Sequence, residues 1–257
     1  MWPTPVQLGS VGFNLYGVLV ATGALLGLFF LRRTALLVGW TAKQASDLGF
    51  WLIIWGLLGS RLFYVLFHWG EFSSQPFKIL LYWQGGLMFQ GAVVAAGLAA
   101  FMILKKQGRS FWSAADAMGP PLALGQSVGR LGCYAAGCCY GQPAPGFALA
   151  VIFPPGVPAP GGFPLYPTQL MESLGLFTLS VVLWLYLRRR PAPGRVFGLY
   201  LLLAGALRLV MEQYRGDFRG LPFWGQAPTF WVALGLAAVG LWRLTRRSRS
   251  PIVEPRF

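Results

Sequence analysis

The chain has 257 residues, of which 56% are hydrophobic and 11% are charged, and its mean hydropathy is +0.57. Soluble domains carry about 25% charged residues, so this composition excludes an ordinary water-soluble fold and indicates an integral membrane protein. The formal net charge of +14 would suit nucleic-acid binding, but the positions of the basic residues along the chain argue against that class.

Apolar stretches of the length that a membrane-spanning helix needs recur along the whole chain. They are continuous rather than alternating, which argues against an outer-membrane barrel. The sequence predicts seven helices, over residues 15–31, 49–67, 86–104, 111–131, 167–187, 197–214 and 229–242. We therefore expect an all-α integral membrane protein with a single membrane domain over residues 1–257.

Clusters of basic residues follow the first, third, fifth and seventh predicted helices. Counting helices places all the clusters on one side, and the positive-inside rule makes that side the cytoplasm. The sequence thus predicts seven transmembrane helices with the N-terminus outside and the C-terminus in the cytoplasm. The clusters are Arg32, Arg33 and Lys43; Lys105, Lys106 and Arg109; Arg188, Arg189, Arg190 and Arg195; and Arg243, Arg246, Arg247, Arg249 and Arg256.

Two of the predicted outer connections have a distinct character. Residues 68–85 mix aromatic and polar side chains, which predicts an arm lying in the membrane interface. Residues 138–166 form the long connection and are rich in proline and glycine. We expect a small extracytoplasmic cap there, with short strands around residues 147–153, where the side chains favour β-structure.

Several charged residues fall inside or at the outer ends of the predicted helices. Arg208, Glu212 and Arg215 are spaced by four and three residues, which places them on one face of a helix. One interpretation is an intrahelical salt bridge in which the glutamate neutralises one arginine. Two arginines and one glutamate leave a net positive charge, however. With Arg130 and Arg61 they would form a pocket for an anion such as a lipid phosphate.

Other polar side chains have two interpretations each. Gln169 and Glu172 follow Pro167 at the start of a predicted helix, and Glu172 would either balance an arginine or contact substrate. Tyr16 lies where tyrosine is common as an interface anchor. His68 is the one histidine of the chain and would be either an interfacial side chain or a base.

All three cysteines lie in the segment SVGRLGCYAAGCCYG, residues 127–141. Cys133, Cys138 and Cys139 have no histidine near them in sequence, which argues against a zinc site, and we expect no metal. They could be small packing residues, or form a disulfide on the outer side. A third alternative is a nucleophilic thiol activated by Arg130.

From end to end the chain resembles the bacterial prolipoprotein diacylglyceryl transferase family. GRLGCYAAGCCYG is similar to the family signature G-R-x-G-N-F-x-N-x-E-x-x-G, so Arg130 matches its essential arginine and Gly141 its last glycine. YPTQLMES is similar to H/Y-P-S-Q-L-Y-E. GALRLVMEQYR is similar to a motif with a second essential arginine and a glutamate, here Arg208 and Glu212. Tyr16 matches a functional tyrosine, and Arg61 an arginine of the second helix.

The resemblance implies a lipid site near the outer leaflet of the bacterial cytoplasmic (inner) membrane. The implied reaction moves a diacylglyceryl group from phosphatidylglycerol to the lipobox cysteine of a prelipoprotein, without a metal or cofactor, and releases glycerol phosphate. Arg130 and Arg208 would hold the phosphate, and Tyr16 and Gln90 would form hydrogen bonds at the reacting groups. We expect a monomer in the bilayer with no nucleic-acid partner. The expected substrate contacts are Arg61, Cys133, Cys138, Gly141, Gln169, Glu172, Glu212 and Arg215.

The chain departs from the family at chemically important positions. Gln90, in GGLMFQGA, stands where the family has a histidine that is proposed to help deprotonate the acceptor thiol. Cys133 stands for an asparagine and Cys138 for a glutamate. Two alternative functions follow: the same scaffold with another acceptor, including a cysteine that carries a lipid intermediate, or a phospholipid-binding membrane protein without catalysis.

Overall fold

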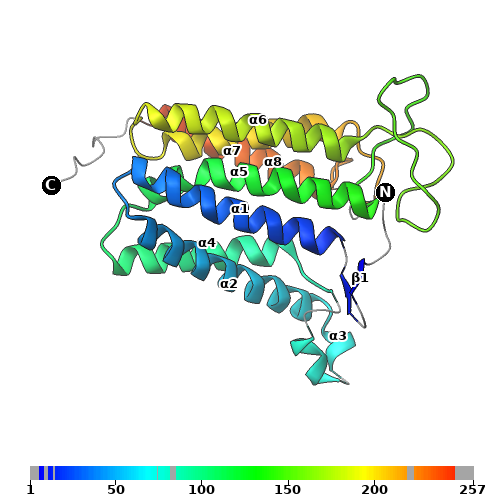
Figure 1. The fold of residues 1–257 in the computed structure, drawn as a ribbon, viewed down its shortest axis with the longest axis horizontal. Coiled ribbons are helices and arrows are strands. Elements are labelled where there is room, and N and C mark those ends of the chain that lie inside the picture. Colours follow the sequence, from blue (N-terminus) through cyan, green and yellow to red (C-terminus); the bar gives the residue numbers. More distant parts are fainter. Residues whose placement is uncertain are drawn as a thin grey trace.

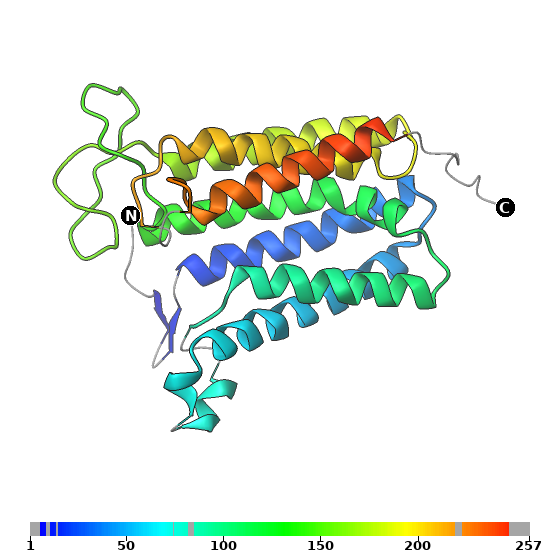
Figure 2. The same cartoon turned by 180° about the vertical axis from the view of Figure 1, so that it is seen from behind.

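The computed structural model describes residues 6–8, 11–13, 15–73, 75–81, 85–218 and 223–246. Within them, seven long helices run side by side (Figures 1 and 2). Each predicted helix coincides with one of these, and several extend beyond the predicted bounds. They are α1 (Leu15–Leu37), α2 (Ala42–Phe67), α4 (Phe89–Lys106), α5 (Phe111–Ala136), α6 (Thr168–Arg188), α7 (Arg195–Glu212) and α8 (Pro228–Thr245).

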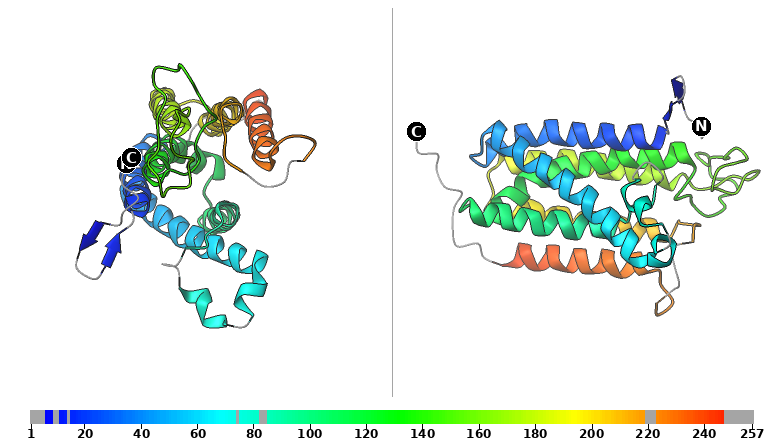
Figure 3. Two further views of the ribbon diagram at one scale, coloured as in Figure 1. Left: turned by 90° about the vertical axis from the view of Figure 1, so that its right-hand side faces the viewer. Right: turned by 90° about the horizontal axis from the view of Figure 1, so that it is seen from below.

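Five of the helices in the described part of the chain are long and apolar enough to cross a membrane: α1, α2, α4, α6 and α8. The other two, α5 and α7, carry charged residues within their length. α5 packs against α1, α6 and α7, and α7 also packs against α8. Figure 3 shows α1 and α5 in the middle, with α2 and α4 on one side and α6, α7 and α8 on the other. Asp116 of α5 and Glu212 of α7 are buried among the helices, where charge within a membrane protein is tolerated, whereas Arg195 at the start of α7 is exposed.

Polar bonds between helices hold α5 in the middle of the domain. Pro121 has no N–H to donate to the carbonyl oxygen of Ala117, one turn earlier, and the hydroxyl of Thr34 on α1 donates to that oxygen at 2.7 Å. The hydroxyl of Ser180 on α6 donates to the carbonyl oxygen of Pro120 at 2.8 Å. The two prolines are thus accommodated by neighbouring helices, which fixes α5 relative to both.

A buried carboxylate of α5 fixes the start of α7. Asp116 accepts the backbone N–H of Gly194 at 2.5 Å and that of Phe197 at 2.7 Å. The first N–H groups of a helix lack partners within the helix, and a negative charge is favourable there. Asp116 therefore caps α7 rather than stabilising the start of its own helix.

The predicted arm is present as two short helices, α3 (Trp69–Phe72) and the 3₁₀ helix η1 (Pro76–Leu80), which lie beyond the end of α2 (Figure 1). Arg61 on α2 is buried and donates to the carbonyl oxygens of Lys78 at 2.6 Å and Gly85 at 2.6 Å. Arg61 thereby ties the arm to α2. Residues 74 and 82–84, which include two aromatic residues of the predicted arm, lie outside the described residues.

The cap over residues 138–166 lies beyond the ends of α5 and α6 (Figure 2). The expected strands around residues 147–153 are wrong, because this fully described loop contains only isolated bridges, such as Val151 with Leu165 and Phe153 with Gly161. The sequence after Phe153 explains the difference, since prolines at 154, 155, 158 and 160 cannot donate to a ladder. Instead Phe153, Ala159 and Leu165 form a small buried core. An unpredicted hairpin of β1 (Val6–Leu8) and β2 (Val11–Phe13) precedes α1.

Replacing Thr34 with valine keeps the side-chain shape but removes the donor to Ala117. Because the acceptor is fully buried, we expect a loss of about 1–2 kcal/mol in the free energy of unfolding. Thr34→Ser should recover most of it. Thr22→Val is the matched control on the same helix, since Thr22 is exposed and bonds only within α1. Thermal unfolding in detergent measures all three, and equal stability of Thr34→Val and wild type would contradict the role of this bond.

Candidate functional site

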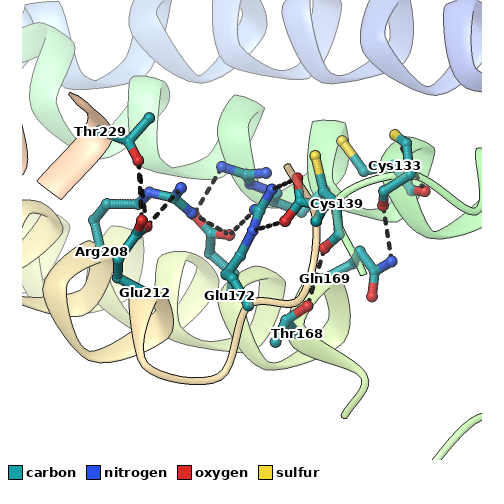
Figure 4. Close-up of polar contacts among 12 residues, drawn as sticks. Cys133, Cys139, Thr168, Gln169, Glu172, Arg208, Glu212 and Thr229 are labelled. Atoms are coloured by element: carbon teal, nitrogen blue, oxygen red, sulfur yellow. Dashed lines mark hydrogen bonds and ion pairs between the residues drawn. The ribbon is translucent and has the colours of Figure 1, made fainter. Parts of the chain in front are cut away.

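Six charged side chains gather at the end of the domain that carries the cap. We call them the arginine–carboxylate cluster: Arg130, Arg208, Arg215, Glu172, Glu212 and Asp217. They come from the last turns of α5, the first turns of α6, the end of α7 and the segment after α7. Figure 4 shows that the contacts form one continuous network.

Glu172 lies at the centre of this cluster. Its Oε1 is 2.8 Å from Nη2 of Arg130, and its Oε2 is 3.7 Å from Nη1 of Arg208 and 3.9 Å from Nη1 of Arg215. The Glu172 side chain is only 6% exposed. A buried carboxylate of this kind is stable only when cations compensate it, so Glu172 draws three helix ends together.

The ion pair between Arg208 and Glu212 is the one that the sequence spacing predicted. Nη2 of Arg208 lies 3.1 Å from Oε2 of Glu212, one turn later on α7. The hydroxyl of Thr229, at the start of α8, donates to the same carboxylate at 3.2 Å. Nothing in the sequence pointed to Thr229, because its contribution depends on how α8 packs on α7.

Arg215 lies beyond the end of α7 and is held by a bidentate pair. Its Nε and Nη2 are each 2.7 Å from a carboxylate oxygen of Asp217. Burial alone would lower the pKa of the Arg215 guanidinium, but Asp217 and Cys139 raise that pKa above its ordinary value. Asp217 was not predicted from the sequence, although its position two residues after an arginine in YRGD was a signal for an ion pair.

Gly141 explains how the Arg215 segment is positioned. Gly141 forms a bridge with Arg215, and a Cβ atom at 141 would clash with the backbone of Tyr166. The N–H of Gln142 donates to the carbonyl oxygen of Tyr214 at 2.8 Å. The close approach that a glycine allows here is therefore between three backbone segments of the site.

The expected surplus of positive charge is corrected by the structure, since Glu172 and Asp217 bring the cluster to three guanidinium groups and three carboxylates. Three of the six side chains are partly exposed: Arg130, Arg208 and Asp217, at 24%, 17% and 16%. Those of Arg215, Glu172 and Glu212 are 4%, 6% and 4% exposed. An anion reaching this site would therefore meet the guanidinium groups of Arg130 and Arg208, with one carboxylate also within reach of solvent.

Two buried acceptors at the site accept no hydrogen bond from the residues that the structure describes. They are Oε1 of Gln169 and Oε2 of Glu172. A buried acceptor without a donor is costly, and such atoms are where a ligand with hydroxyl groups gains most. Both atoms are fully buried in this structure, so a donor from a ligand would reach them only after neighbouring side chains move.

The three cysteines meet beside the cluster. Their Sγ atoms all lie within 4.8 Å of one another, and each residue is partly buried. Gln169 donates from Nε2 to the carbonyl oxygen of Cys138 at 2.8 Å, and the hydroxyl of Thr168 donates to that of Cys139 at 3.0 Å (Figure 4). The first turn of α6 therefore fixes the backbone that carries two of the thiols.

The remaining expected residues lie in different surroundings. A Cβ atom at Gly132 would be 3.3 Å from Cδ2 of Tyr16, so this tyrosine of α1 packs beside Cys133. Gln90 is exposed at the start of α4, and its side chain makes no hydrogen bond within the described part of the chain. Arg61 is engaged with the carbonyl groups of the arm rather than through an ion pair with Glu172.

Comparisons with known proteins agree with the resemblance of the motifs. The family model described as prolipoprotein diacylglyceryl transferase matches residues 3–246. A phosphatidylglycerol–prolipoprotein diacylglyceryl transferase of Polynucleobacter asymbioticus is 33% identical over 256 residues, covering 96% of each chain. Those of Photobacterium profundum and Clostridium tetani are 32% and 31% identical, over 91% and 86% of this chain and 86% and 88% of theirs. The chain therefore belongs to the prolipoprotein diacylglyceryl transferase family.

Proposed function

We propose that this protein transfers the diacylglyceryl group of phosphatidylglycerol to the thiol of a lipobox cysteine in a prelipoprotein. The observation that carries the proposal is the pair of partly exposed arginines, Arg130 and Arg208, which share the buried carboxylate of Glu172. Relatives named for this reaction match nearly the whole chain. The two guanidinium groups provide the fixed positive charge that the departing phosphate of that reaction needs.

The reaction is a displacement at a glyceryl carbon. The thiolate sulfur attacks that carbon while its bond to the phosphate oxygen breaks, which forms a thioether and releases glycerol phosphate. Negative charge grows on the departing phosphate oxygen, and fixed guanidinium groups stabilise such charge. Arg130 and Arg208 would contact the phosphate, while Glu172 and Glu212 hold the two guanidinium groups in place.

The head group of phosphatidylglycerol carries hydroxyl groups, which can serve the two buried acceptors of the site. Oε1 of Gln169 accepts no hydrogen bond from the described residues, and Oε2 of Glu172 is approached only by the longer ion pairs with Arg208 and Arg215. A glycerol hydroxyl bonded to either atom would favour this head group over one with no donor. Arg215, whose side chain is 4% exposed, would act through its contacts with Glu172 and Asp217.

In the bilayer, all seven long helices would span, as one domain with a monomer as the functional unit. α5 and α7, which are too polar to face lipid along their length, would be shielded by the other five. The basic clusters favour a cytoplasmic C-terminus, which would place the arginine–carboxylate cluster, the arm (68–85) and the cap (138–166) toward the outer leaflet of the bacterial cytoplasmic membrane. Tyr16 would border the lipid site there, beside Cys133.

Replacing either exposed arginine with alanine should lower kcat/KM for thioether formation by about 100- to 1,000-fold, as loss of a group that stabilises transition-state charge does. Lysine should restore part of the rate at either position, since it keeps the positive charge but lacks the paired N–H groups with which a guanidinium binds phosphate. The assay is mass spectrometry of a lipobox peptide incubated with the purified variants and phosphatidylglycerol.

Arg188→Ala is a suitable control, because Arg188 lies at the opposite end of α6 from Glu172. The same assay in cells depleted of their own transferase tests the function as a whole. Absence of any thioether product with the wild-type chain would overturn the proposed reaction, and full activity of Arg130→Ala would overturn the role of the arginines.

Glu172→Gln keeps the size of the side chain but removes the charge that Arg130 and Arg208 share. We expect kcat to fall about tenfold or more and the KM for phosphatidylglycerol to rise, because the guanidinium groups lose their fixed positions. Thr229→Val, which removes only one donor to Glu212, should change either constant less than threefold or so. Steady-state kinetics with both variants tests whether Glu172→Gln is the more damaging change. An inactive Thr229→Val beside an active Glu172→Gln would contradict this expectation.

A further inference from the structure

The three cysteines come together through an abrupt change of chain direction. Cys133 lies in the last turn of α5, and Gly137 ends the helix with a φ of 66°. Cys138 and Cys139 follow, and Cys139 itself adopts a φ of 61°, which is uncommon for a residue other than glycine. These turns fold the last two cysteines back toward the first, and the Cys138 sulfur lies 3.6 Å from the carbonyl oxygen of Cys133.

The spacing of the sulfurs suits a thiophilic ion. In tetrahedral coordination with Zn–S bonds of about 2.3 Å, two sulfurs lie roughly 3.8 Å apart. The three Sγ atoms here already lie within 4.8 Å of one another. Rotation of the side chains closes the remaining difference, so the backbone needs no rearrangement to bind an ion.

The surroundings of the sulfurs also favour a bound ion over simple packing. Thr168 and Gln169 hold the carbonyl groups of Cys139 and Cys138, so the two backbone segments are fixed before any ion arrives. Each cysteine is partly exposed, as binding of an ion with a further ligand would require.

We propose that Cys133, Cys138 and Cys139 bind one Zn²⁺ ion and leave its fourth position open for the acceptor thiol. Three protein ligands with an open position are typical of a catalytic zinc site, whereas structural sites are closed. Among the described residues, the group of potential ligands consists of these three cysteines. The identity of the acceptor rests on the proposed function, whereas the zinc site itself does not.

A bound zinc ion would solve a problem that Gln90 creates. Glutamine cannot take a proton, and a free thiol with a pKa of about 8.5 is only a few per cent ionised at pH 7. A thiol that coordinates a metal ion is deprotonated. Zinc would therefore supply the thiolate beside the arginines without a protein base.

The step balances without an oxidant or another reactant. The acceptor thiol binds the open position and releases its proton to solvent. The coordinated sulfur then attacks the glyceryl carbon, and the bond from that carbon to the phosphate oxygen breaks. The oxygen keeps the electron pair, next to Arg130 and Arg208. The product is a neutral thioether, a weaker zinc ligand than a thiolate, so it can leave the ion.

The zinc site is tested first without reference to activity. The full-length protein is purified in detergent with a reductant, stripped with a chelator and titrated with Zn²⁺ against a chromophoric competitor. We expect one ion per chain and, in Cys133→Ser, Cys138→Ser and Cys139→Ser, an affinity reduced by more than the roughly 10- to 100-fold that loss of an outer-shell group costs. Arg130→Ala is the matched control that should keep the ion. Wild-type protein without stoichiometric zinc overturns the proposal, whether or not the serine variants fold.

The open position is tested with Co²⁺ in place of Zn²⁺, because cobalt bound to thiolates absorbs visibly. A lipobox peptide with its cysteine should intensify the sulfur-to-cobalt absorption, and the same peptide with that cysteine replaced by serine should not. An unchanged spectrum with the cysteine peptide overturns the open position. A disulfide between any two of the cysteines in the zinc-treated, non-reduced protein would overturn the site as well.

Turnover separates this inference from the proposed function. At pH 7 the reduced, metal-free enzyme should be about 30-fold slower than the zinc-loaded enzyme, because only a few per cent of the free thiol is ionised. Its rate should then rise about 16-fold between pH 7 and pH 8.5, as the ionised fraction of the thiol does, while the loaded enzyme changes little. Equal rates and equal pH profiles would remove zinc from the reaction but leave the transferase intact. Stoichiometric zinc without any thioether product would remove the transferase but leave the site.

Discussion

The site depends on the ion pairs that the Glu172 carboxylate makes with Arg130 and Arg208. The carboxylate lies at the start of α6, almost inaccessible, between the guanidinium groups of Arg130 and Arg208. Any one of these charges alone would be very costly inside a membrane domain. Together they compensate one another, which holds α5, α6 and α7 close to one another at this end of the domain. The same balance leaves the side chains of Arg130 and Arg208 partly exposed, at 24% and 17%, above the buried carboxylate.

The position of Arg130 in turn depends on how α5 is held lower in the domain. Prolines 120 and 121 would weaken an isolated helix, yet Thr34 and Ser180 on two neighbouring helices bond to the carbonyl groups around them. Asp116 of the same helix caps α7. α5 is therefore fixed to α1, α6 and α7 by polar contacts far from the site, and these contacts set where its last turn, with Arg130 and Cys133, comes to lie.

A feature could be predicted from the sequence where the residues that determine it are close together in the chain. The seven helices are long apolar runs and were therefore predictable. The ion pair of Arg208 and Glu212 was predictable too, because the two residues are one helical turn apart. Arg215 was expected on the same helix face, but α7 ends at Glu212, and Asp217 and Gly141 place Arg215 instead. Thr229 and Thr168 contribute through packing between segments distant in sequence. The strands expected around residues 147–153 failed because the following prolines prevent a ladder.

The cysteines show why spacing in the sequence could not decide whether a metal site is present. Zinc motifs are recognised by regular spacings, whereas here a left-handed turn at Gly137 and another at Cys139 bring the thiols together. Arg130 and Cys133 are three residues apart on α5, hence on one face of the helix. The two halves of a displacement, stabilising the leaving phosphate and generating the attacking sulfur, would thus be carried by adjacent turns of one rigid element. In such a site the arginines would keep the role that the family resemblance implies for them, while the thiols at 133, 138 and 139 would supply the thiolate that Gln90 cannot generate.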